Sequence, residues 1–153
     1  MNTIKSLFQS AFKHHQTGDL ARAATSYTKI LDLQPGHVDV LFLLGALNLQ
    51  LRNYDAACVL LRKTLILKPD YGMAHGNLGS SLQGLGRLEE ATVSYQQAVA
   101  HSPDYADGYY NLANTLKEMG KLEEAVKNYK KAIELKPDDA EIHTNLGNAL
   151  REQ

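Results

Sequence analysis

The six histidines of the sequence are its most obvious candidates for chemistry, since imidazole is a common metal ligand. They are His14, His15, His37, His75, His101 and His143. Two ligands on one helix face need a spacing of three or four residues, and no pair of these histidines has it. The single cysteine, Cys58, cannot supply a second thiolate. We therefore expect no metal site and no cofactor.

Two glutamate pairs and a glycine-rich segment are the other groups that could do chemistry. The pairs at 89–90 and 123–124 each open an apolar helical pattern, where carboxylates favour the positive end of the helix dipole. The segment 84–86 follows no strand and precedes no Gly-Lys-Ser/Thr, so it is not a phosphate loop. Because the sequence contains no nucleophile–base pair, metal-ligand set or phosphate loop, we predict that the chain is not an enzyme.

The spacing of the prolines indicates the repeated elements that position these groups, since the prolines recur at a fixed period. Pro35, Pro69, Pro103 and Pro137 are 34 residues apart and are all the prolines of the chain. Such a period is typical of repeat proteins. With each proline at repeat position 32, the repeats are 4–37, 38–71, 72–105, 106–139 and a partial copy, 140–153. We expect these repeats to form a single domain, 1–153.

Each repeat has the pattern of two helices joined by a tight turn. Position 8 is small (Ala11, Gly45, Gly79, Ala113, Gly147), position 20 is alanine (Ala23, Ala57, Ala91, Ala125), and position 24 is large (Tyr27, Leu61, Tyr95, Tyr129). Apolar residues at positions 7 and 11 share one helix face. We therefore expect the small residues to allow a close approach of the two helices and the large residue to fill the space beside them.

The turns carry their own signals. Position 15 is glycine in three repeats, which ends the first helix in the left-handed conformation. The second repeat has Arg52 there, and we expect Asn53 to take this role. Asp70, Asp104 and Asp138 follow the prolines, and we expect them to cap the next helix.

This pattern resembles the tetratricopeptide repeat (TPR) family. The clearest copies are Leu78-Gly79…Leu82…Gly86…Ala91…Tyr95…Ala98…Pro103 and Leu112-Ala113…Leu116…Gly120…Ala125…Tyr129…Ala132…Pro137. The resemblance covers residues 4–153 and implies an all-α fold, a right-handed superhelical solenoid of antiparallel helix pairs with about four and a half repeats. It also implies a protein-interaction scaffold, in which the first helices of the repeats line a concave groove.

The resemblance places two kinds of side chain in this groove, and we expect them to bind a peptide. The apolar group is Phe8, Phe12, Phe42 and Leu43, and the polar group is Asn77, Tyr110, Asn111, Asn114, Asn145 and Asn148. Asparagine has two donors and an acceptor, so a ladder of them can hold an extended peptide by its backbone. A similar ladder is a feature of the TPR region of O-GlcNAc transferase. The alternatives are that the asparagines only solvate the groove or hydrogen-bond neighbouring helices, and that the phenylalanines pack on a missing N-terminal element or on another copy of the chain.

The expected ligand is an extended or helical protein segment. We expect an apolar anchor at the first two repeats and backbone contacts at the later ones, with about micromolar affinity. The carboxylate clamp by which some TPR proteins bind chaperone tails needs lysine and arginine at groove positions 2, 5 and 6. No register of this chain carries them, so we do not expect that ligand.

Charge is balanced overall but uneven along the chain. The net charge is −1, which favours neither nucleic acid nor an anionic membrane as a partner. Residues 1–69 contain eight Lys/Arg and four Asp/Glu, about +4, whereas residues 70–153 contain eight and thirteen, about −5. The first 20 residues are amphipathic and do not form a signal peptide. We expect a cytoplasmic location.

The last segment has the pattern of a first helix without its partner. Leu146 and Leu150 are apolar residues that would pack against the second helix of a complete repeat. We therefore expect that the chain is a fragment of a longer array or that this last helix packs on another molecule. Self-association through this helix or through the phenylalanine-rich part of the groove is one such mode. The alternative function is a substrate-recruiting arm of a larger enzyme, such as a glycosyltransferase, truncated at Gln153.

Overall fold

The computed structural model describes residues 2–153, which form nine α-helices and no β-strand. The helices are α1 (Asn2–Gln16), α2 (Leu20–Leu33), α3 (Val38–Gln50), α4 (Tyr54–Leu67), α5 (Gly72–Gly84), α6 (Leu88–His101), α7 (Ala106–Glu118), α8 (Leu122–Leu135) and α9 (Ala140–Glu152). This confirms the expected all-α repeat fold. The contacts group the chain into an N-terminal unit, Met1–Pro69, and a C-terminal unit, Asp70–Gln153. The expected single domain stays a prediction.

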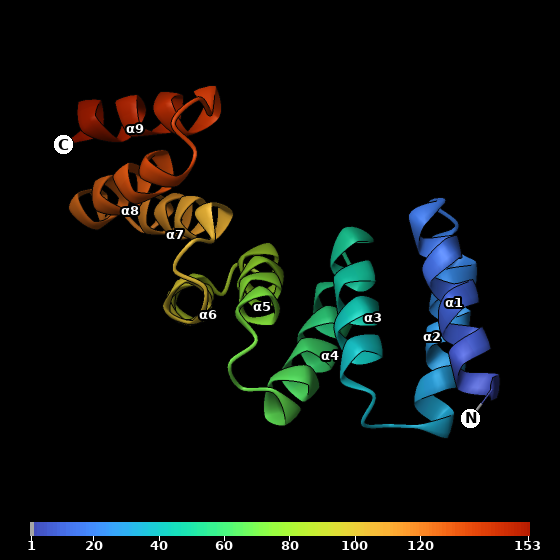
Figure 1. The fold of residues 1–153 in the computed structure, drawn as a ribbon. Coiled ribbons are helices and arrows are strands. Elements are labelled where there is room, and N and C mark those ends of the chain that lie inside the picture. The colour runs from blue at the N-terminus through green and yellow to red at the C-terminus, as the bar shows by residue number, and fades with distance from the viewer. Residues whose placement is uncertain (1) are drawn as a thin grey trace. The chain divides into compact units, whose positions relative to one another are not determined.

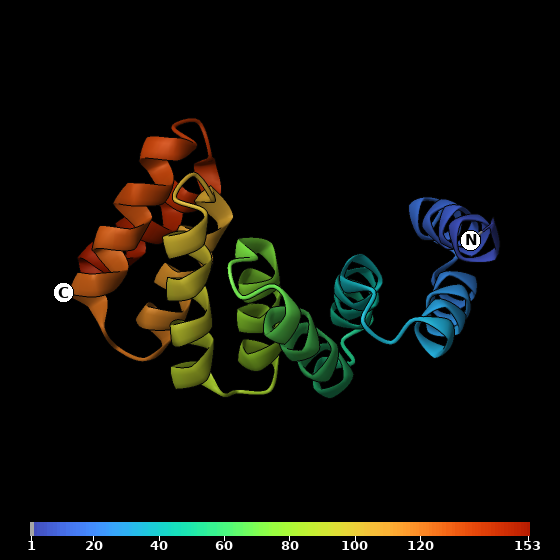
Figure 2. The ribbon, with the colours of Figure 1, turned by 60° about the horizontal axis from the view of Figure 1, so that its bottom comes forward.

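Each repeat is a helical hairpin, with α1 on α2, α3 on α4, α5 on α6 and α7 on α8 (Figure 1). Within the N-terminal unit, α2 also packs on α3. Within the C-terminal unit, α6 packs on α7 and α8 on α9 (Figure 2). The first helices α5, α7 and α9 also contact one another in succession. The C-terminal unit therefore has one face that is formed by first helices alone.

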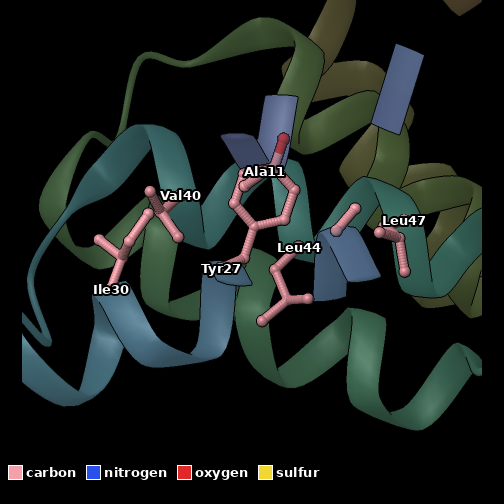
Figure 3. Packing of buried hydrophobic residues seen from close by; sticks show 7 residues of the cluster. Ala11, Tyr27, Ile30, Val40, Leu44 and Leu47 are labelled. Carbon is pink, nitrogen blue, oxygen red and sulfur yellow. The ribbon is translucent and has the colours of Figure 1, made fainter. Parts of the chain in front are cut away.

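The repeat positions that the sequence marked as packing positions form the core. The alanines at position 20 and the large residues at position 24 are all buried. In the N-terminal unit Ile30 of α2 packs against Val40 of α3, and the ring of Tyr27 lies beside Ala11 of α1 (Figure 3). Small side chains thus let the helices approach, and the large one fills the space between them.

Gly79 and Gly147 occupy the same repeat position in different surroundings. A Cβ at Gly79 would lie 2.8 Å from the buried ring of Tyr95, whereas a Cβ at Gly147 would meet no atom within 4 Å. Gly79→Ala should therefore destabilise the chain by about 1–3 kcal/mol through overpacking. Gly147→Ala should stabilise it by about 0.5–1 kcal/mol, because alanine restricts the unfolded chain. Urea denaturation of both variants checks this pair, and a loss of stability at Gly147 would contradict it.

The turn between the two helices of a repeat has one conformation throughout, and it corrects one prediction. Gly18, Gly86 and Gly120 have φ between 72° and 79°, and in the second repeat Arg52 itself has φ of 60°. Asn53, which we expected to take this role, has φ of −83° and is the N-cap of α4. The backbone N–H of Asn53 donates to the carbonyl of Asn48 at 2.8 Å, as the residues that follow the three glycines also do five residues back. This shared hydrogen bond requires the left-handed conformation at Arg52.

Arg52→Gly is expected to stabilise the N-terminal unit by about 0.5–1 kcal/mol. A left-handed conformation costs a non-glycine residue about 1–2 kcal/mol, and the greater freedom of glycine in the unfolded chain offsets part of this gain. The measurement is the shift in the midpoint of thermal unfolding. Arg62→Gly, in the interior of α4, is the control, and it should destabilise.

The helix caps after the prolines also differ from prediction. The expected caps Asp70, Asp104 and Asp138 each lie one residue too early, because the turn is one residue longer than expected. The residues at the N-cap position are Tyr71, Tyr105 and Asp139. Among these three, only Asp139 caps with its side chain, which accepts from the N–H groups of the second and third residues of α9 at 3.0 and 3.2 Å.

Candidate functional site

Three asparagines lie at the same position on the three first helices of the C-terminal unit. Asn77 is on α5, Asn111 on α7 and Asn145 on α9, and all three are half-buried. The side-chain amides of Asn77 and Asn111 make no hydrogen bond with any residue that the structure describes. Two donors and one acceptor on each of these side chains are therefore open to a ligand.

Tyr110 on α7 is hydrogen-bonded to two residues of α9, and one of them is the third asparagine, Asn145. Its hydroxyl donates to Oε1 of Glu141 at 2.6 Å and accepts from Nδ2 of Asn145 at 2.8 Å. Its ring lies 6.1 Å from that of Tyr129. Burial and the hydrogen bond to Glu141 together raise the pKa of Tyr110. Asn145 thus keeps one side-chain N–H and its side-chain carbonyl for a ligand. The sequence analysis did not predict Glu141 as a member of this cluster.

The side chains one turn further along the first helices bind the buried tyrosines of the second helices. Tyr129 donates to Oδ1 of Asn114 at 2.5 Å. The hydroxyls of Ser80 and Tyr95 lie 2.9 Å apart. Asn148 accepts a hydrogen bond from Arg151 within α9. Asn114 therefore has structural contacts with Tyr129 and with Tyr110 in addition to its expected binding role. The side-chain N–H groups of Asn148 have no partner among the described residues.

Two polar pairs join the ends of consecutive first helices on the same face. Nε2 of Gln83 donates to Oε2 of Glu118 at 3.5 Å, between α5 and α7. Nζ of Lys117 lies 3.1 Å from Oε1 of Glu152, between α7 and α9. Each pair joins position 12 of one repeat to position 13 of the next, so the contacts follow the period of the repeat.

Alkaline pH should destabilise the C-terminal unit through its two buried phenols. Burial raises the pKa of Tyr95 and of Tyr129 to about 12, above the value of 10.0 for an exposed tyrosine. Because the folded pKa is the higher one, the stabilisation is complete below pH 10 and is lost as the pH rises toward 12. We expect the urea midpoint to fall between pH 10 and 12. The fall should be smaller in Tyr95→Phe, and an equal fall in that variant would contradict this account.

The N-terminal unit contains a stack of three rings. The ring of Phe8 lies 5.8 Å from His37 and 6.2 Å from Phe12, with interplanar angles of 8° and 6°. A pocket of about 650 Å³ opens beside the stack, lined by Ile4, Lys5, Phe8, Gln9, Gln34, His37 and Asp39. The pocket is therefore lined by both apolar and polar side chains, and only Phe8 among its lining residues was predicted as a site residue.

The other predicted apolar site residues lie in different surroundings. Phe12 is 41% exposed, as a ligand contact requires. Leu43 is half-buried and packs on the core of the N-terminal unit. We expected Phe42 in the groove, but it is only 8% exposed and belongs to the packed core. Its role in binding stays a prediction. Its replacement by alanine should therefore reduce stability, and Phe12 is the better residue for a binding test.

The last helix leaves part of its apolar side uncovered within the chain. Ile142 and Ala149 are buried, Leu146 is half-buried and Leu150 is 48% exposed. The expectation that another molecule packs on this helix stays a prediction.

Two negative findings apply to the part of the chain that the structure describes. Its histidine, cysteine, aspartate and glutamate side chains form no group of three or more that could hold a metal ion. None of its helices combines the length and apolarity needed to cross a membrane.

Comparisons with known proteins agree with this architecture. Two family models, described as TPR repeat and as tetratricopeptide repeat, match residues 82–120 with 113–153 and residues 14–80. No curated protein sequence matches the chain at a significant level.

Several solved structures are similar to this chain. A crystal structure of MamA protein has a TM-score of 0.93 and 27% identity over 99% of this chain and 84% of that one. MamA from Desulfovibrio magneticus has a TM-score of 0.83 and 25% identity over 90% and 77%. An O-GlcNAc transferase mutant from Thermobaculum terrenum has a TM-score of 0.79 and 27% identity, over 87% of this chain but only 26% of that protein. The repeat pattern, the helical hairpins and these matches together show that the chain belongs to the tetratricopeptide repeat family and has the architecture of a protein-interaction scaffold.

Proposed function

We propose that the C-terminal unit binds an extended protein segment by its main chain, on the face formed by α5, α7 and α9. The observation that carries this proposal is the pair of open side-chain amides at Asn77 and Asn111, which occupy equivalent positions in consecutive repeats. An extended segment presents N–H and C=O groups at regular intervals along its length. Side-chain amides supply both a donor and an acceptor for such groups, whatever the side chains of the ligand are.

The N-terminal unit supports a second contact of a different kind. We infer that the pocket beside Phe8 takes one apolar side chain of a protein ligand. Burial of such a side chain contributes about 1.5–3 kcal/mol, and the side chains of Ile4 and Phe8 supply apolar surface in the pocket. The loss of freedom on association offsets much of this gain, so about micromolar affinity is expected.

A selection of peptides tests the proposed function. A random library of linear 12-residue peptides is selected on the immobilised full chain, and the enriched peptides are synthesised and titrated by calorimetry. We expect peptides of about micromolar affinity that weaken when two or three of their backbone amides are N-methylated. Selection that enriches no peptide, or peptides that tolerate this methylation, would count against main-chain binding by the C-terminal unit.

A second candidate function is that of a substrate-recruiting arm of a larger enzyme. The observation that favours it is the likeness to an O-GlcNAc transferase, of which this chain spans about a quarter. The reading frame that follows Gln153 in the source gene distinguishes the two. A catalytic domain encoded there would support the recruiting arm, and a stop codon would remove it.

A further inference from the structure

The carboxylate of Glu141 is held in place on the binding face without a cation beside it. Its Oε1 accepts from the hydroxyl of Tyr110 at 2.6 Å, and its side chain is exposed. Within the described residues, Glu141 forms no ion pair with lysine or arginine. The hydroxyl that holds it is in turn bound by Asn145 at 2.8 Å. One oxygen of the carboxylate thus accepts a hydrogen bond, and the other has no side-chain partner among the described residues.

The neighbouring charges of this face already have partners. Lys117 pairs with Glu152 at 3.1 Å, and Lys136 pairs with Asp107 at 2.7 Å. Arg151 donates to Asn148 on its own helix. These two lysines and this arginine are therefore engaged, whereas the carboxylate of Glu141 accepts a side-chain hydrogen bond only from the neutral hydroxyl of Tyr110 among the described residues.

The C-terminal unit as a whole is negatively charged, as the carboxylate of Glu141 is. The C-terminal unit contains eight Lys/Arg and thirteen Asp/Glu, about −5. A carboxylate that is fixed by hydrogen bonds in a negative field attracts a cationic group more than a mobile exposed one does, because less side-chain freedom is lost on pairing. The position of Glu141 beside Asn145 places this attraction next to the main-chain contacts of the ligand.

We propose that the segment bound by the C-terminal unit is basic, and that Glu141 pairs with a lysine or arginine side chain of that segment. Tyr110 acts as a positioning residue that holds the carboxylate. The inference rests on the proposed function of this face and names the chemistry of its partner.

Peptide selection on matched variants tests the inference. The same random 12-residue library is selected on the full wild-type chain, on Glu141→Gln and on Glu89→Gln, which makes the same charge change at an exposed site on the second helix α6. Wild type and Glu89→Gln should enrich lysine or arginine at one peptide position. Selection on Glu141→Gln should lose that enrichment, and its persistence there would overturn the inference.

Titration then measures the pairing directly. In a peptide selected by wild type, replacement of the enriched cation by norleucine should weaken binding to wild type about 3- to 10-fold. The same replacement should leave the affinity for Glu141→Gln unchanged within about 2-fold, since the partner is already gone. An equal loss in both proteins would overturn the pairing.

Tyr110→Phe separates positioning from pairing. The variant keeps the ring and removes the hydroxyl that holds Glu141, so the ratio of the affinities for the cationic peptide and for its norleucine analogue should fall toward the ratio measured with Glu141→Gln. A preference unchanged from wild type would show that Tyr110 does not position the carboxylate.

Failure of the inference and failure of the proposed function give different results. If only the inference fails, peptides still bind through Asn77 and Asn111 but show no preference for a cation. If the proposed function fails, the affinity of the selected peptides does not depend on these two asparagines, and the inference falls with it.

Discussion

Replacement of Tyr129 by alanine is expected to lower the free energy of unfolding by about 3–5 kcal/mol, the range for the loss of a large buried aromatic side chain. Tyr129 is fully buried between the two helices of the fourth repeat, beside Tyr110. Its hydroxyl donates to Asn114 at 2.5 Å. The variant therefore loses apolar contacts, leaves a cavity and removes the hydrogen-bond partner of the Asn114 side-chain oxygen. Urea denaturation followed by circular dichroism at pH 7 measures the change.

Tyr129→Phe is the matched control for this large effect. Phenylalanine keeps the ring and removes only the hydrogen bond, which contributes about 1 kcal/mol. An alanine variant that lost no more stability than the phenylalanine variant would show that the ring of Tyr129 does not fill the space between the two helices. That result would contradict the packing described for the repeat.

The double variant Asn77→Ala/Asn111→Ala is expected to weaken every selected peptide by on the order of 30-fold. Each open amide forms at least one hydrogen bond to the ligand, and each such bond contributes about 1 kcal/mol. Two of them correspond to this factor, since 1.4 kcal/mol is tenfold in affinity. The stability of the chain should change little, because neither side-chain amide has a partner among the described residues. Calorimetric titration of the selected peptides measures the loss.

Asn128→Ala controls for the loss of an asparagine as such. Asn128 is on the second helix α8, and its amide donates to the backbone carbonyl of Glu124 at 2.9 Å. Its replacement should leave peptide affinity unchanged. If Asn128→Ala weakened binding as much as the double variant, or if the double variant bound like wild type, the assignment of the binding face would fail.

The sequence was sufficient to predict the fold because the fold depends on a local and repeated pattern. The period of the prolines placed every repeat, and small and large residues at fixed positions predicted the buried contacts of the core. The same period predicted the ladder of Asn77, Asn111 and Asn145, since equivalent positions on stacked repeats lie on one face.

The departures from prediction have specific physical causes. Arg52 adopts the left-handed conformation because the hydrogen bond of the turn requires it, although this conformation is unfavourable for a residue other than glycine. Phe42 is buried although its repeat position belongs to the groove in the family. The contact of Tyr110 with Glu141 joins residues in different repeats, and a search along the sequence for known ligand patterns does not reveal it. The pocket beside Phe8 depends on the packing of His37 against that ring.

The side-chain amide resonances of Asn77 and Asn111 test the central claim most directly. At 16.9 kDa the chain suits nitrogen–proton correlation spectroscopy, and the two Asn→Ala variants assign these resonances by their disappearance. Titration with a selected peptide should shift both pairs of amide protons with the same midpoint as the calorimetric binding curve, and the N-methylated peptide should not shift them. A peptide that binds while both resonances stay in place would contradict the claim that these asparagines hold the main chain of the ligand.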